Sequence, residues 1–74
     1  MCELKNEYSA ILGNNIKKYR QMNMMSQTEL AKKLGLSQNA ICRYENGDRD
    51  PSTQIIYKLC EVLQVDFNEL YNII

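Results

Sequence analysis

The feature that most constrains this sequence is a pair of helix-start signals separated by a very short connection. Ser26 and Glu29 have the spacing of a capping box, in which the serine accepts a backbone hydrogen bond and the glutamate reaches back to the cap. Gly35 can end the helix that follows, because glycine adopts a positive φ at low cost. Ser37 then caps another helix after only one intervening residue. The sequence therefore predicts helices over about 27–34 and 38–46 that cross steeply.

Side-chain size supports this crossing. Ala31 and Gly35 supply small residues where the two backbones approach, and five apolar residues at helical spacing can hold the angle: Leu30, Leu34, Leu36, Ile41 and Tyr44. The alternative is a helical hairpin that is packed for structure alone.

Helical spacing continues along the rest of the chain, and no segment alternates as a strand does. A first helix over about 6–22 carries one apolar stripe: Leu4, Tyr8, Ile11, Leu12, Ile16, Tyr19 and Met22. Ser52 and Asp66 cap helices over about 53–63 and 67–72, the former burying Ile55, Ile56, Leu59, Cys60 and Leu63. The methionines at 22, 24 and 25 are expected to fill gaps in the core. We predict an all-α, compact five-helix bundle, a single domain over 1–74 with its core at about 12–71.

Composition excludes several functions. Three cysteines without a close pair, and no histidine, disfavour a disulfide framework or a zinc site, so we expect no metal or cofactor. There is no glycine-rich phosphate loop and no nucleophile–base pair, so we expect neither an enzyme nor a small-molecule substrate. No apolar run approaches the roughly 20 residues of a membrane span, and the N-terminus lacks the apolar core of a signal peptide. We expect a cytoplasmic protein with reduced thiols.

The charge is polarised, although the net charge is zero. Residues 14–49 carry seven basic and three acidic side chains, whereas the remaining residues carry two basic and six acidic ones. A basic patch can attract phosphate when the acidic groups lie on another face. Ordinary surface charge is the alternative interpretation.

Two segments resemble the phage repressor/Cro-type helix-turn-helix proteins, often called the XRE family: Ser26–Ser37 and Ile41–Gly47, with Arg20 upstream and Pro51-Ser52 downstream. The resemblance covers about Leu12 to Tyr71. It implies the lambda-repressor-like fold of five helices, with the third helix in the major groove of double-stranded DNA. It further implies a transcriptional regulator, usually a repressor, that binds a palindromic operator as a homodimer.

The helix over 38–46 carries side chains suited to reading bases. Gln38 and Asn39 have carboxamides that match the N6 donor and N7 acceptor of adenine, and the Arg43 fork suits either guanine or a phosphate. The resemblance places base reading at these three residues, flanked by Ser37 and Ala40. The alternative is that these polar residues lie near a helix start only because they favour solvent, and that they read no base.

DNA-backbone contacts are expected from Gln27, at a helix N-terminus whose amides can face a phosphate, and, by the resemblance, from Asn46 and Arg49. Weaker candidates are four lysines: Lys17, Lys18, Lys32 and Lys33. The resemblance also implies a structural salt bridge between Arg20 and Glu45, which would orient the recognition helix.

Two positions depart from the family pattern. Many relatives have glycine where Met24 and Gln64 stand, so a positive φ is expected to cost energy at Gln64, and at Met24 unless Asn23 adopts it instead. Cys42 lies near the expected DNA-facing side, where a redox switch would need a lowered thiol pKa.

The C-terminal segment is apolar for a chain end, and a dimer interface would explain it: Phe67, Leu70, Tyr71, Ile73 and Ile74. The alternative is that these residues close the core of their own domain. The rival function is a protein-interaction module, such as an antitoxin or antirepressor, with secondary DNA binding. Near-neutral charge and the apolar tail favour this rival slightly.

Overall fold

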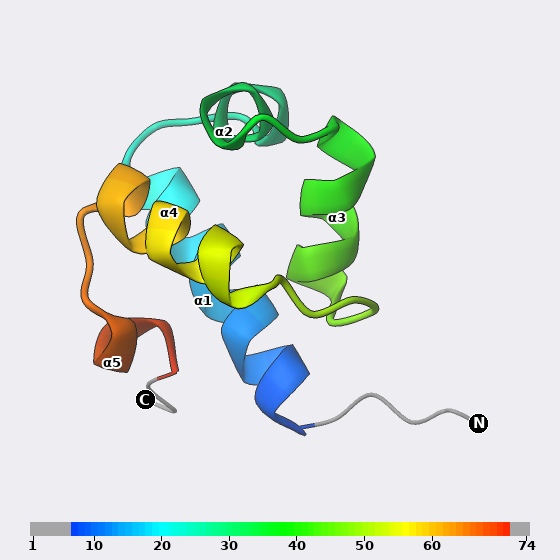
Figure 1. Ribbon diagram of the computed structural model, residues 1–74, viewed down its shortest axis with the longest axis vertical. Coiled ribbons are helices and arrows are strands. Elements are labelled where there is room, and N and C mark those ends of the chain that lie inside the picture. The colour runs from blue at the N-terminus through cyan, green and yellow to red at the C-terminus, as the bar shows by residue number, and fades with distance from the viewer. Residues whose placement is uncertain (1–6, 72–74) are drawn as a thin grey trace.

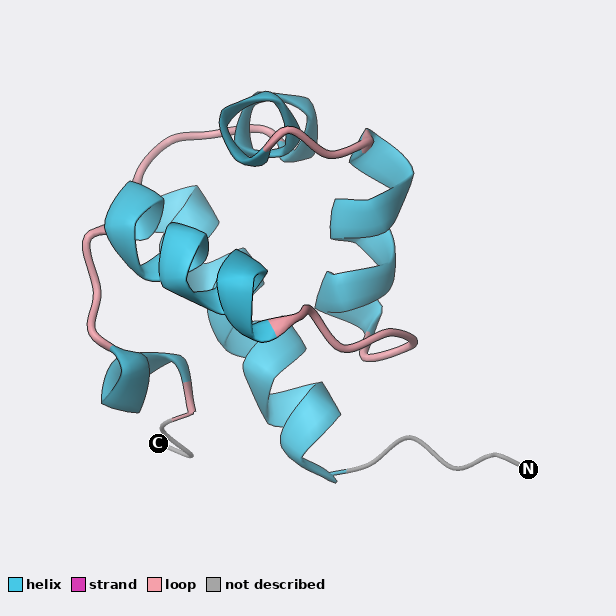
Figure 2. Ribbon diagram, in the orientation of Figure 1, coloured by secondary structure: helices cyan, strands magenta, loops and turns pink. Residues whose placement is uncertain are grey.

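The computed structural model describes residues 7–71, which form five helices in sequence order (Figure 1). They are α1 (Glu7–Met22), α2 (Gln27–Leu34), α3 (Gln38–Asn46), α4 (Thr53–Leu63) and α5 (Phe67–Leu70). Within this range all regular structure is helical (Figure 2), so the predicted all-α five-helix fold is confirmed. The fifth helix ends at Leu70, slightly before the predicted end. In Figure 1, α3 and α5 lie on opposite sides of the molecule.

The predicted caps set the helix boundaries. Four helices begin at a residue whose side chain accepts a hydrogen bond from the third helical residue: Ser26, Ser37, Ser52 and Asp66. Gly35 and Gly47 end α2 and α3 in the left-handed conformation, with φ of 72° and 77°. These local signals determine how long each helix is, because each satisfies backbone groups that the helix leaves free.

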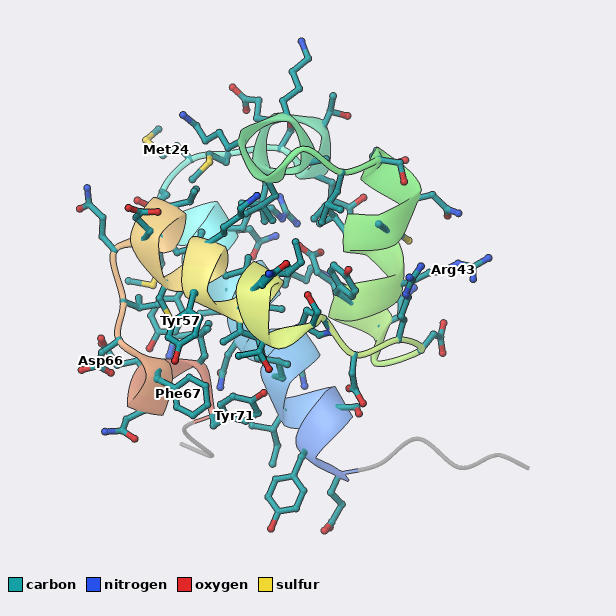
Figure 3. The ribbon with its side chains drawn as sticks, in the orientation of Figure 1. Met24, Arg43, Tyr57, Asp66, Phe67 and Tyr71 are labelled. Atoms are coloured by element: carbon teal, nitrogen blue, oxygen red, sulfur yellow. The ribbon has the colours of Figure 1, made fainter. Side chains whose placement is uncertain are left out.

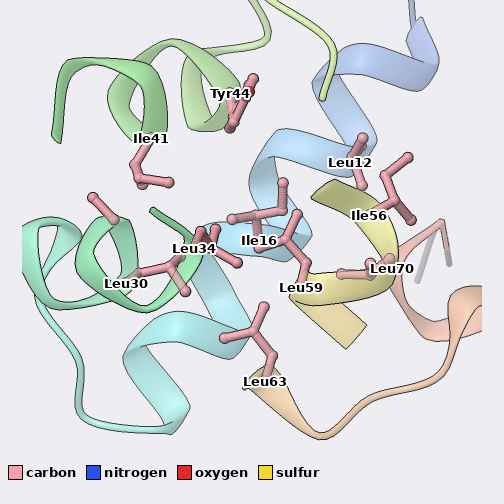
Figure 4. Close-up of a cluster of buried hydrophobic side chains, with 11 residues drawn as sticks. Leu12, Ile16, Leu30, Leu34, Ile41, Tyr44, Ile56, Leu59, Leu63 and Leu70 are labelled. Carbon is pink, nitrogen blue, oxygen red and sulfur yellow. The ribbon is translucent and has the colours of Figure 1, made fainter. Parts of the chain in front are cut away.

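One apolar cluster joins all five helices (Figure 4). Its buried members are Leu12, Ile16, Leu30, Ala31, Leu34, Ile41, Tyr44, Ile56, Leu59, Leu63 and Leu70. Full burial of a leucine or isoleucine contributes about 1.5–3 kcal/mol, so this cluster is the main stabilising element. Leu70 is completely buried in it. The expectation that Leu70 contributes to a dimer interface is therefore corrected, because its side chain closes the core of its own chain.

The apolar stripe expected on α1 is buried only in its middle part, and its ends are exposed. Leu12 and Ile16 are buried, but Tyr8 and Met22 are 67% and 66% exposed. Leu4 lies outside the described residues. Met24 is 89% exposed, so the expectation that Met22 and Met24 fill the core is wrong. Helical spacing alone does not distinguish the ends of a stripe, where the helix extends beyond its neighbours, from its buried middle.

Close backbone approach between α1 and α3 was not predicted. A Cβ added at Gly13 would lie 2.4 Å from the carbonyl oxygen of Tyr44 and 2.7 Å from that of Glu45. Nearby, the buried Asn15 donates to the carbonyl oxygen of Leu70 at 2.7 Å, which joins α1 to the end of α5. The approach at Gly13 places α3 directly against α1, and the Asn15 hydrogen bond holds the end of α5 on α1. Among residues 7–71, no helix is long and apolar enough to cross a membrane.

Candidate nucleic-acid interface

The connection between α2 and α3 is held by backbone hydrogen bonds and by core packing. The amide of Leu36 donates to the carbonyl oxygen of Ala31 at 2.8 Å, across the left-handed turn at Gly35. Leu30 and Ile41 are fully buried on either side of the turn. The two helices therefore form a fixed unit that holds the outer face of α3 in one orientation.

The outer face of α3 is polar and exposed. Gln38 and Asn39 lie exposed in its first turn, and Arg43 and Asn46 lie exposed one and two turns further along. In Figure 3, the Arg43 side chain extends away from the body of the molecule. Ser37 is exposed, but its hydroxyl accepts from the amide of Ala40 at 3.2 Å and so serves as the cap. The structure thus brings the candidate base-reading residues together on one helix.

Arg20 and Glu45 form a buried ion pair between α1 and α3. Arg20 Nε donates to Glu45 Oε2 at 2.6 Å and Nη2 donates to Oε1 at 3.2 Å, with side-chain exposures of 9% and 2%. Arg20 Nη1 also donates to the carbonyl oxygen of Met25 at 2.7 Å. A pair with this many hydrogen bonds offsets much of the cost of removing both charges from water. The pair connects α1, the corner before α2, and α3.

Gln27 has contacts that its sequence position did not predict. Its Nε2 donates to Glu45 Oε1 at 3.0 Å, and its Oε1 accepts from Gln38 Nε2 at 2.6 Å. The side chain is half-buried at the start of α2. Gln27 therefore connects the buried ion pair to a candidate base-reading residue. Both partners are distant in sequence, and only the packing of α2 on α3 brings them together.

The loop after α3 continues this surface. Arg49 is exposed there, and Asp50 accepts a hydrogen bond from the buried Ser9 hydroxyl of α1, which anchors the loop. On α3 itself, Asn46 Nδ2 contacts the half-buried Cys42 Sγ at 3.6 Å.

The candidate lysines are exposed on α1 and α2. Lys17, Lys18, Lys32 and Lys33 all face solvent. Lys18 Nζ lies 5.2 Å from the centre of the Tyr19 ring, so part of its charge is directed toward an aromatic face. In the described part of the chain, no cluster of three or more histidine, cysteine, aspartate or glutamate side chains could hold a metal ion.

Comparisons with known proteins agree with this geometry. The helix-turn-helix family HTH_3 matches residues 16–70. Antitoxin PezA of Streptococcus pneumoniae is 35% identical over 60 residues, which are 81% of this chain and 38% of the relative. An uncharacterized HTH-type transcriptional regulator of Methanocaldococcus jannaschii is 34% identical over 78% of this chain and 88% of the relative. The chain thus spans well under half of the first relative and most of the second.

Solved structures show the same fold. The restriction-modification controller protein C.AhdI from Aeromonas hydrophila superposes with a TM-score of 0.79 at 28% identity, covering 85% of this chain and 96% of that protein. The family match over residues 16–70 includes the α2–α3 unit and both partners of the buried ion pair. The expected resemblance to repressor/Cro-type proteins is confirmed, and the chain belongs to this helix-turn-helix family of DNA-binding regulators.

Proposed function

We propose that this protein is a sequence-specific transcriptional regulator that inserts α3 into the major groove of double-stranded DNA. The observation that carries the proposal is the exposed polar face of α3, held at a fixed angle by the α2–α3 turn and the buried core. The major groove of B-DNA admits one α-helix and presents a distinct pattern of donors and acceptors for each base pair.

Base reading comes from the first two turns of α3. Gln38 and Asn39 present carboxamides that can pair bidentately with adenine, and Arg43 presents a guanidinium for guanine or for a phosphate. Ser37 and Ala40 lie beside them as the cap and its hydrogen-bond donor. A good bidentate contact contributes about 1–3 kcal/mol of discrimination against the wrong base.

DNA-backbone contacts set the register of this helix. The N-terminus of α2, at Gln27, presents free amides toward a phosphate, and Asn46 and Arg49 lie exposed at the far end of α3. The net positive charge of residues 14–49 supports phosphate binding by this half of the molecule.

The protein acts as a homodimer on a palindromic operator, most simply as a repressor in the cytoplasm, where the DNA is. Support comes from an aromatic surface formed by Tyr57, Phe67 and Tyr71 on the side of the molecule opposite α3 (Figure 3). Phe67 and Tyr57 are 53% and 69% exposed, and the Phe67 ring centroid lies 5.1 Å from that of Tyr71. Ile73 and Ile74, also expected at the interface, lie outside the described residues. Binding to two half-sites on one face of the DNA requires the two α3 helices of such a dimer to lie about 34 Å apart, one turn of DNA.

A protein-interaction role is the second candidate. The relatives include PezA, which is named an antitoxin. The segment that carries this aromatic surface, residues 50–71, is acidic, since Asp50, Glu61, Asp66 and Glu69 outnumber Lys58. An acidic and aromatic face suits a basic protein partner by charge complementarity.

Selection of binding sites from a random duplex library tests the main proposal. We expect one enriched palindromic site, and we expect binding to random duplex that weakens steeply with salt, with a slope of roughly −0.9 per phosphate contacted. Gln38→Ala should relax preference at one base pair and cost about 1–3 kcal/mol on the selected site alone. Absence of duplex binding at about 50 mM salt would favour the protein-interaction role.

A further inference from the structure

The loop between α3 and α4 is attached to the first turn of α1 near both of its ends. Its first residue, Gly47, is buried, and a Cβ added there would lie 3.4 Å from the Cα of Ala10. Near its other end, the Asp50 carboxylate accepts a hydrogen bond from the buried Ser9 hydroxyl, and Pro51 is buried. These attachments fix the path of the loop, although its middle residues are exposed.

Arg49 lies in the exposed middle of this loop, between Asp48 and Asp50 in the sequence. Among residues 7–71, its guanidinium takes part in no ion pair. An arginine that pairs with a neighbouring carboxylate has less charge to offer a phosphate. The Asp50 carboxylate is directed elsewhere, toward the Ser9 hydroxyl. Burial, and next the charge of Asp50, raise the pKa of Tyr71, so this carboxylate also lies within electrostatic reach of the residue that follows α5.

We propose that Ser9 is a positioning residue for DNA binding: its hydroxyl holds the Asp50 carboxylate on α1, and this holds the neighbouring Arg49 toward a phosphate of the duplex. The inference rests on the proposed function, because it assumes that Arg49 contacts the DNA backbone. It gives the first turn of α1, which carries none of the expected DNA contacts, a part in setting the register of α3. A released Asp50 carboxylate would bring a negative charge close to the phosphate or to Arg49, and either change weakens the contact.

The salt dependence of DNA affinity measures this contact, because each phosphate contacted adds about 0.9 to the slope of log K against log salt concentration. The probe is a duplex that carries the site selected from the random library. The readout is fluorescence anisotropy between about 50 and 200 mM salt. Ser9→Ala changes no charge, so a purely structural loss would lower its thermal stability without altering this slope. Thermal unfolding shows that each variant is folded.

Arg49→Ala sets the scale of the expected change, since its slope should be shallower than that of the wild type by about 0.9. Ser9→Ala should reproduce at least half of this change, although it leaves Arg49 in place. Added to Arg49→Ala it should change the slope no further, because the contact through which it acts is already lost. Ser9→Thr keeps the hydroxyl and should keep the slope of the wild type.

A matched pair of substitutions at position 50 separates the hydrogen bond from the charge. Asp50→Asn and Asp50→Ala both remove the negative charge, but only asparagine keeps an oxygen that can accept from the Ser9 hydroxyl. The slope should be steeper for Asp50→Asn than for Asp50→Ala, and the difference should vanish in a Ser9→Ala background. As a control, Asn23→Ala removes a hydrogen bond to the carbonyl oxygen of Leu63, beyond the other end of α1, and should leave the slope unchanged.

A wild-type slope in Ser9→Ala would overturn the inference while leaving the Arg49 contact intact. So would equal slopes for Asp50→Asn and Asp50→Ala, or an effect of Ser9→Ala that persists without Arg49. If Arg49→Ala leaves the slope unchanged, Arg49 contacts no phosphate and the positioning role fails, whereas base reading by α3 is tested separately by Gln38→Ala. Absence of duplex binding by the wild type would refute the proposed function itself.

Discussion

At the residue scale, two side chains occupy backbone conformations that favour glycine. Met24 and Gln64 both have a φ of 58°. Met24→Gly should raise the free energy of unfolding by about 0.5–1 kcal/mol, because relief of the left-handed strain exceeds the added entropy of the unfolded chain. Urea unfolding measures this change. Met22→Gly, at an exposed helical methionine close by, should lower the stability instead. Equal effects of the two substitutions would contradict the assignment of strain to Met24.

The positive φ at these two positions was expected from the family resemblance, because many relatives have glycine there. The close approach at Gly13 was not expected, since a glycine within a helix looks like a weak point until the partner helix is known. Its hydrogen lies where a Cβ would meet the carbonyl oxygens of Tyr44 and Glu45. The caps at Ser26 and Ser37 could be predicted from the sequence. The contacts of Gln27 with Glu45 and Gln38, like the approach at Gly13, depend on how the helices pack.

Gly13→Ala should therefore destabilise the protein, although the same substitution in an open helix stabilises by about 1 kcal/mol. The added methyl group would force α1 and α3 apart, with a cost of about 1–3 kcal/mol. Thermal unfolding checks the sign, and Asn14→Ala, at the next and exposed position, should be neutral or stabilising. A stabilising Gly13→Ala would show that α1 and α3 do not approach as closely as described.

At the scale of elements, the Arg20–Glu45 pair holds α3 to α1. Arg20→Met would leave the carboxylate of Glu45 buried without its charge partner, and it should cost about 3–5 kcal/mol. Glu45→Met should cost a similar amount for the same reason. The double variant should lose clearly less free energy of unfolding than the two single variants lose together, because it leaves no charge unpaired. Additive losses in chemical unfolding would argue that the two residues do not interact.

The capping box of α2 makes the stability of the protein depend on pH. The backbone amide of Ser26, followed by its side chain, holds the pKa of Glu29 below its ordinary value of 4.5. A carboxyl group whose pKa is lower in the folded state contributes stability above its unfolded pKa, and this contribution is lost as the pH falls through the folded pKa. Glu29→Gln keeps the hydrogen-bonding shape without titrating. Its unfolding midpoint should therefore fall less than that of the wild type between about pH 5 and pH 3.

At the scale of the whole molecule, the net charge of zero conceals a separation of charge along the chain. The basic segment 14–49 contains α2 and α3, and the acidic segment after it contains α4 and α5; in Figure 1, α3 and α5 lie on opposite sides of the molecule. This separation is visible in the sequence itself, because both the charges and the order of the helices can be read from it. It could not show which C-terminal apolar residues stay exposed. Leu70 enters the core and Phe67 does not, because a single turn of helix can bury only one of its faces.

Phe67 is therefore the residue through which dimerisation is best tested. The wild type should sediment as a dimer at tens of micromolar, and Phe67→Ala should shift it toward the monomer, because an exposed ring that becomes buried between two copies contributes about 1.5–3 kcal/mol. Tyr8→Ala, at an exposed ring on α1, should leave the association unchanged. If two α3 helices must bind together, Phe67→Ala should weaken binding to a full palindrome far more than to a single half-site, since only the palindrome gains from linking the two contacts. A monomeric wild type at these concentrations would contradict this interface. Equal losses on both duplexes would instead show that one copy binds DNA alone.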